Sequence, residues 1–89
     1  MSKLVIIGAS GHAKVVIDCV RKCGNYEILG LFDDDPKKIG ADFQGVRVLG
    51  EVRSLQPIED ATVLVAIGNN AIRRKIANSL KERGFSFAT

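Results

Sequence analysis

The sequence predicts a small α/β domain with a mostly parallel sheet of about five strands and helices on both faces. Two apolar segments, 4–7 and 62–67, each lead into a glycine-containing turn and then into a helical pattern. Apolar runs that are rich in β-branched residues and bounded by glycine are typical of strands buried on both faces. Because strands alternate with helices, we expect a parallel sheet with right-handed crossovers.

Composition narrows the class of protein. The chain has 89 residues, of which 46% are hydrophobic and 26% charged, as in a single soluble globular domain. The net charge of +3 slightly favours anionic ligands. No basic cluster is interleaved with aromatic residues, so we expect no nucleic acid partner. No apolar stretch approaches the roughly 20 residues of a membrane span and no secretory signal is visible. We therefore expect a cytoplasmic protein with no membrane partner.

The first helix is expected to run from Ser10 or Gly11 to about Cys23, with a left-handed C-terminal cap at Gly24. Cys19 lies four residues before Cys23, and no further cysteine or nearby histidine completes a metal site. We expect both cysteines to be reduced in the cytoplasm and to act as small hydrophobic residues on the buried face of the helix. That face comprises Val15, Val16, Cys19, Val20 and Cys23.

The next strand is expected over 27–32, where Gly30 indicates a bulge or a close backbone approach. A loop at 33–36 follows, then an irregular excursion over 37–45, a short strand at 46–49, and a helical turn or connector at 50–55. After the strand at 62–67, the second helix buries one apolar stripe, ends at Gly84 and is followed by a fifth strand at 85–88. That stripe is Ile72, Ile76, Ala77 and Leu80, opposite a solvated face of Arg73, Arg74, Lys75, Lys81 and Arg83.

A strand order of 3-2-1-4-5 places the first and fourth strands side by side at a topological switch point. Ligands bind there, outside the carboxyl ends of the strands. Three segments, 8–14, 33–35 and 68–70, are expected to converge on this crevice. The free N–H groups of the first helix would make it an anion-binding site.

Known catalytic and nucleotide motifs fit this crevice incompletely. Gly8, Ser10 and Ala13 match G-x-G-x-x-G/A except at the second glycine, where a pyrophosphate must approach the backbone closely. The serine weakens the case for NAD without excluding it. Residues 8–12 lack the final glycine of a nucleophile elbow, the chain has one histidine, and no P-loop is present.

Each polar residue of the crevice has two interpretations. His12 either hydrogen-bonds a ligand as a neutral ring or faces solvent, and Lys14 either pairs with a phosphate or is merely solvated. Asp33 and Asp34 either accept hydrogen bonds from ribose hydroxyls or a base N–H, or simply end a strand. Asn69 and Asn70 either contact the ligand or cap the second helix.

Taken together, Gly8-Ala9-Ser10-Gly11-His12-Ala13-Lys14, Phe32-Asp33-Asp34-Asp35-Pro36 and Ala66-Ile67-Gly68-Asn69-Asn70 resemble the N-terminal domain of the sialic acid O-acetyltransferase and UDP-N-acetylbacillosamine N-acetyltransferase family. The resemblance covers essentially the whole chain. It implies a Rossmann-like domain that binds the UDP part of a nucleotide sugar. By this resemblance the substrate site would comprise Ser10, Gly11, His12, Ala13, Lys14, Asp33, Asp34, Gly68, Asn69 and Asn70.

In that family a left-handed β-helix follows, which carries the acetyl-CoA site and the catalytic histidine and forms a homotrimer. Residues 1–89 lack its six-residue period, so we expect one substrate-binding domain without catalytic residues, bound cofactor or metal, and monomeric by itself. The resemblance thus implies part of an acetyl-CoA-dependent sugar N- or O-acetyltransferase. The alternatives are an NAD-type redox or sensory module and an interaction domain without a ligand.

Overall fold

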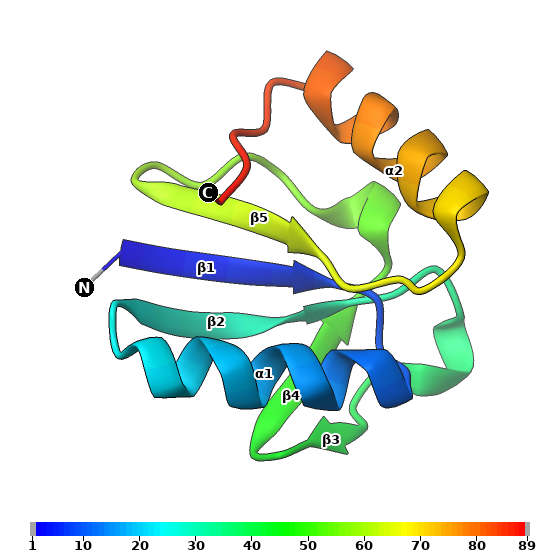
Figure 1. Ribbon diagram of the computed structural model, residues 1–89. Coiled ribbons are helices and arrows are strands. Elements are labelled where there is room, and N and C mark those ends of the chain that lie inside the picture. Colours follow the sequence, from blue (N-terminus) through cyan, green and yellow to red (C-terminus); the bar gives the residue numbers. More distant parts are fainter. Residues whose placement is uncertain (1, 89) are drawn as a thin grey trace.

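The computed structural model describes residues 2–88 and forms a five-stranded sheet with a helix on each face (Figure 1). The strands lie in the order β3-β4-β2-β1-β5, and every pairing is parallel except the β3–β4 hairpin. In chain order the elements are β1 (Ser2–Ile7), α1 (Gly11–Cys23), β2 (Tyr26–Phe32), the 3-10 turn η1 (Pro36–Lys38), β3 (Asp42–Phe43), β4 (Val46–Gly50), the 3-10 turn η2 (Val52–Ser54), β5 (Ala61–Val65) and α2 (Asn70–Glu82).

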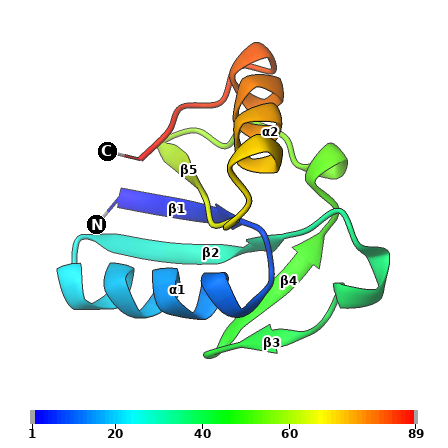
Figure 2. The same cartoon turned by 45° about the vertical axis from the view of Figure 1, so that its right-hand side comes forward.

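Helix α1 covers one face of the sheet and α2 covers the other, so the domain has three layers (Figure 2). Successive residues of β1 point to opposite faces, and residues 4–7 are buried on both. Leu4 and Ile6 belong to the cluster on the α1 side, whereas Val5 and Ile7 belong to the cluster that contains Leu80 of α2. The predicted fold class and the predicted neighbours of β1 are confirmed, because β1 lies between β2 and β5.

Two short elements differ from the expected ones. The irregular excursion at 37–45 overlaps η1 and contains the strand β3. This strand pairs with β4 in a hairpin closed at Gln44 and Gly45, both with positive φ. The expected fifth strand is one bridge between Val63 and Phe87. Only the Val63 backbone pairs there: its N–H donates to the Ser86 carbonyl (2.9 Å), and its carbonyl accepts from the Ala88 N–H (3.0 Å).

The buried face of α1 was predicted only in part: Val20 is buried and Val16 packs partly buried against the same core cluster, as expected. Ala13, Ile17 and Val20 are buried, whereas Val15 is 58% exposed and both cysteines are exposed free thiols. The helical sequence carries two apolar stripes, one through 13, 17 and 20 and one through 15, 19 and 23, and a helix resting on one sheet buries only one of them. The expected helix bounds and the cap are confirmed: Gly24 has φ 71° and its N–H bonds the Val20 carbonyl (3.4 Å).

Gly30 lies at a bulge and also at a close approach between strands, the two alternatives that the sequence indicated. The register of β1 and β2 shifts there, because Leu4 pairs with Ile28 while Val5 pairs with Gly30. A side chain at Gly30 would also collide with Leu49, whose Cγ lies 2.7 Å from the position of an added Cβ. The bulge therefore brings β2 close to β4 just before the strand reaches its carboxyl end.

Arg83 was expected on the solvated face of α2, but it reaches back to η2. Its guanidinium donates hydrogen bonds to the carbonyls of Val52 (3.2 Å), Arg53 (3.5 Å) and Leu55, and lies 5.1 Å from the centre of the Phe85 ring. The fork of guanidinium donors suits this cluster of carbonyls. The sequence did not show it, because residues 52–55 have no regular pattern that places them beside the end of α2.

We expect the substitution Arg83→Met to lower the free energy of unfolding by about 2 kcal/mol, because partly buried carbonyls would lose a charged donor. Urea denaturation monitored by circular dichroism measures the change. Arg74→Met removes the same charge from an exposed position of α2 and should change stability by less than about 0.5 kcal/mol. Equal effects of the two substitutions would show that Arg83 acts only through its charge.

Candidate functional site

The candidate site is a hollow of about 240 Å³ at the carboxyl ends of β1 and β5, the predicted switch point. One side is polar and is built from the turn after β1 and the loop after β2. The other side is apolar and comes from η2, the segment after β5, and α2. The lining residues are Ile7, Gly8, Ala9, Ser10, Asp33, Asp34, Val52, Ile67, Ile72 and Ile76.

The turn after β1 passes tightly beneath the segment that follows β5. Gly8 has φ +106°, a conformation that L side chains rarely adopt, and its N–H donates to the Phe32 carbonyl (2.7 Å). An added Cβ at Gly8 would lie 2.9 Å from both the Ala66 carbonyl oxygen and Ile67 Cγ1. The first glycine of the motif is therefore required by the packing of the turn itself, whatever the ligand.

Asp33 is occupied by contacts within the protein. Its Oδ2 accepts a hydrogen bond from the Ala9 N–H (2.7 Å), and its Oδ1 accepts one from the Asp35 N–H (2.8 Å). The Lys38 ammonium lies 3.9 Å from Oδ2 and donates to the Ala9 carbonyl (2.7 Å). Asp33 thus holds the turn after β1, whereas Asp34 is exposed, borders the hollow and has its carboxylate available to a ligand.

At the start of α1 the expected site residues take different positions. Ser10 borders the hollow as the N-cap without a side-chain capping bond, so its hydroxyl is available there. Gly11 and His12 are exposed in the first turn, where the earliest N–H groups have no intrahelical acceptor. Ala13 has no exposed surface, and its N–H bonds the Ser10 carbonyl (3.0 Å), so its side chain belongs to the core. Lys14 lies over the ring of Phe43, 5.8 Å from its centre.

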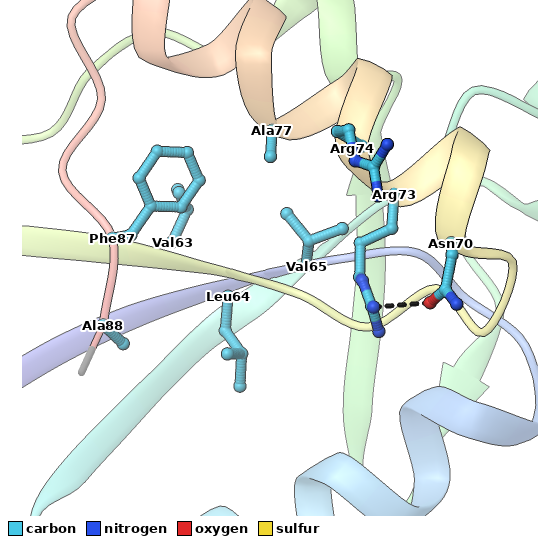
Figure 3. Close-up of a pocket in the computed structure, with 9 residues that line it drawn as sticks. All are labelled: Val63, Leu64, Val65, Asn70, Arg73, Arg74, Ala77, Phe87 and Ala88. Carbon is cyan, nitrogen blue, oxygen red and sulfur yellow. Dashed lines mark hydrogen bonds between the residues drawn. The ribbon is translucent and has the colours of Figure 1, made fainter.

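The three residues of the segment 68–70, at the start of α2, also take different positions. Gly68 is exposed, and Asn69 caps the helix through its Oδ1, which accepts from the Ile72 N–H (3.0 Å). Asn70 accepts from Arg73 (2.5 Å) and faces a second hollow of about 330 Å³, between the outer edge of β5 and α2 (Figure 3). None of the three lines the first hollow. The structure therefore places Ser10, Asp33 and Asp34 together and the three residues of 68–70 outside that group.

The apolar side of the hollow was missed. Ile67, Ile72 and Ile76 follow β5 and line it with Val52, and Ile72 remains 51% exposed. Ile72 was expected in the buried stripe of α2, but the structure leaves it at the exposed start of the helix, so that stripe was predicted wrongly at this position. An isoleucine in the first turn of a helix, next to the predicted switch point, is a signal that could have found this wall. Val52 carried no such signal, because its placement depends on the path of the irregular segment 51–60.

The described part of the chain shows neither a metal-binding cluster nor a membrane-spanning helix. No group of three or more histidine, cysteine or acidic side chains among residues 2–88 could hold a metal ion. Within the same residues, neither helix has the length and apolar character needed to cross a membrane.

Residues 3–80 match the family described as the PglD N-terminal domain. The chain is 27% identical over 84 residues to UDP-N-acetylbacillosamine N-acetyltransferase of Bacillus subtilis, covering 90% of the chain and 38% of that relative.

Solved structures of sugar N-acetyltransferases are also similar to this chain. A mutant perosamine N-acetyltransferase from Caulobacter crescentus, in complex with CoA and GDP-perosamine, is 33% identical with a TM-score of 0.74, covering 96% of this chain and 40% of that one. The acetyltransferase domain of PglB from Neisseria gonorrhoeae is 36% identical with a TM-score of 0.75, covering 96% and 42%. The chain thus spans about two fifths of the length of these proteins, and it belongs to the PglD N-terminal domain family.

Proposed function

We propose that the chain binds a nucleoside diphosphate sugar in the hollow at the carboxyl ends of β1 and β5. In this proposal it is the substrate-binding part of a sugar acetyltransferase that uses acetyl-CoA. The main support is the joining of a helix N-terminus, an available carboxylate and an apolar wall in one hollow. The similarity to an N-acetyltransferase solved with GDP-perosamine adds to it.

Each part of the hollow suits one part of such a ligand. The N–H groups at the start of α1 would bind the diphosphate, since they have no intrahelical acceptors and lie at the positive end of the helix dipole. The Asp34 carboxylate would accept hydrogen bonds from ribose hydroxyls or from a base N–H. Ile67 and Ile72 would pack against the flat face of the base.

The proposed reaction is attack of a sugar amine or hydroxyl on the acetyl-CoA thioester, with release of the free thiol of CoA. The attacking group must lose a proton, and within the part of the chain that the structure describes no histidine borders the hollow. His12 is the chain's one histidine; it is exposed on α1 and does not border the hollow. We therefore propose that this domain recognises the sugar nucleotide. In this proposal, residues outside this domain bind acetyl-CoA and remove the proton.

Titrating the ¹⁵N-labelled chain with UDP, a UDP-amino sugar, GDP, NAD and CoA, and following amide shifts by NMR, tests the proposal. We expect sugar nucleotides to shift the amides of 8–11 and 33–34, and CoA to leave them unchanged. Preference for UDP or GDP would identify the base. Preferential NAD binding would instead support the dinucleotide alternative, and shifts confined to other residues would overturn the proposed site.

We expect Gly11→Ala to weaken nucleotide diphosphate binding about tenfold while leaving the fold intact. An added Cβ at Gly11 meets no atom within 4 Å, and its φ lies outside the left-handed region. The methyl group would therefore crowd only a ligand that approaches the first turn of α1. Isothermal titration calorimetry with UDP and a thermal melt measure the two effects. Unchanged affinity in a stable variant would place the diphosphate elsewhere.

A further inference from the structure

The peptide groups on both sides of Ala9 are held by two side chains from the loop after β2. Asp33 accepts from the Ala9 N–H (2.7 Å), and Lys38 donates to the Ala9 carbonyl (2.7 Å). The two side chains also form an ion pair of 3.9 Å. Ala9 itself is 1% exposed, so the contacts fix a segment that has little room to shift as a whole.

The loop that carries these side chains is itself ordered by local hydrogen bonds. Asp33 accepts from the Asp35 N–H, and Asp35 accepts from the Lys37 N–H (3.0 Å) as the cap of η1. The Lys38 N–H then bonds the Asp35 carbonyl (3.0 Å). The acidic run and Pro36 thus form a compact turn that returns Lys38 to the β1–α1 connection. Its side chain is 37% exposed, so its ammonium is partly hydrated.

Peptide geometry gives the Lys38 contact a consequence for the hollow. The Ala9 carbonyl belongs to the same planar trans peptide as the Ser10 N–H, and in such a unit the C=O and N–H point in opposite directions. The Ser10 N–H therefore points away from Lys38. Ser10 lines the hollow and Lys38 does not.

We propose that Lys38 is a positioning residue that keeps the Ala9–Ser10 peptide oriented with its N–H toward the hollow, where it serves the diphosphate of the nucleotide. This inference rests on the proposed function. Without Lys38, rotation of that peptide would turn the Ala9 carbonyl toward the hollow, and a carbonyl dipole repels an anion. Asp33 fixes the preceding peptide, so rotation is confined to the one peptide that Lys38 holds.

The test compares wild-type protein with Lys38→Met, which keeps the length of the side chain but removes its donor, and with Lys38→Arg, which restores a charged donor. Lys37→Met is the matched control for charge, because Lys37 is exposed and its side chain makes no hydrogen bond or ion pair within residues 2–88. Affinities are measured for UDP and for uridine. Residual dipolar couplings of the ligand-free proteins report the direction of the Ser10 N–H.

We expect Lys38→Met to weaken UDP binding about tenfold and to leave uridine binding unchanged, because only UDP carries phosphate. Lys38→Arg and Lys37→Met should bind UDP within about threefold of wild type, and only Lys38→Met should change the Ser10 coupling. Equal losses in Lys37→Met and Lys38→Met, or an unchanged coupling in Lys38→Met, would overturn the inference. If wild-type protein binds neither ligand, the proposed function fails, and the coupling alone decides whether Lys38 orients the peptide.

Discussion

The substitution Gly8→Ala is expected to lower the free energy of unfolding by about 4 kcal/mol. Two costs add at this position. Alanine is strained at φ +106°, and its Cβ would lie 2.9 Å from the Ala66 carbonyl oxygen, a backbone atom held by the neighbouring strand connection. The Ala66 N–H bonds the Ile7 carbonyl (2.7 Å), so that segment cannot move away without losing a contact between β1 and the end of β5.

Urea denaturation of Gly8→Ala beside Gly24→Ala separates the two costs. Gly24 also has a positive φ, of 71°, but nothing lies within 4 Å of an added Cβ. Gly24→Ala should therefore cost only the left-handed strain, about 1 kcal/mol. If both variants lose the same stability, the collision with Ala66 contributes nothing, and the tight passage of the turn beneath Ala66 does not constrain residue 8.

The parts of the fold that follow from periodicity could be predicted. The apolar run at 4–7 identifies a strand buried on both faces, and the run at 62–67 identifies β5, whose residues apart from Val63 are only partly buried. The order of strands and helices fixes the neighbours of β1. The buried face of α1 was predicted correctly only at Val16 and Val20, because its sequence contains two apolar stripes and only tertiary packing selects one. The hairpin of β3 escaped notice because a strand of two residues has no detectable period.

The candidate site was predictable in its position but less so in its composition. The switch point follows from topology, and Ser10, Asp33 and Asp34 do border one hollow there. What sequence spacing cannot provide is the direction of each side chain. Lys14 lies against Phe43, and Asn70 pairs with Arg73, although both occupy segments that converge on the switch point. Lys38 gave no signal in the sequence, because its contact with Ala9 depends on the path of η1.

Asp33 and Asp34 are adjacent acids with the same two interpretations in the sequence. We expect their alanine variants to differ in stability and in the way they affect ligand binding. Asp33→Ala should lower the free energy of unfolding by about 3 kcal/mol, because the buried Ala9 N–H and the Asp35 N–H would lose their acceptor. Asp34→Ala should change stability by less than about 0.5 kcal/mol, since its carboxylate is exposed. Both substitutions should lower the affinity for a sugar nucleotide, but only Asp34→Ala should do so by removing a contact with the ligand.

Calorimetric titration with UDP, combined with urea denaturation of both variants and of Asp33→Asn, separates these effects. The asparagine keeps one oxygen that can accept from the Ala9 N–H, so Asp33→Asn should recover part of the stability that Asp33→Ala loses. A variant Asp33→Ala that is as stable as wild type but fails to bind nucleotide would contradict this assignment. Asp33 would then contact the ligand directly, and its hydrogen bonds to the Ala9 and Asp35 N–H groups would contribute little to stability.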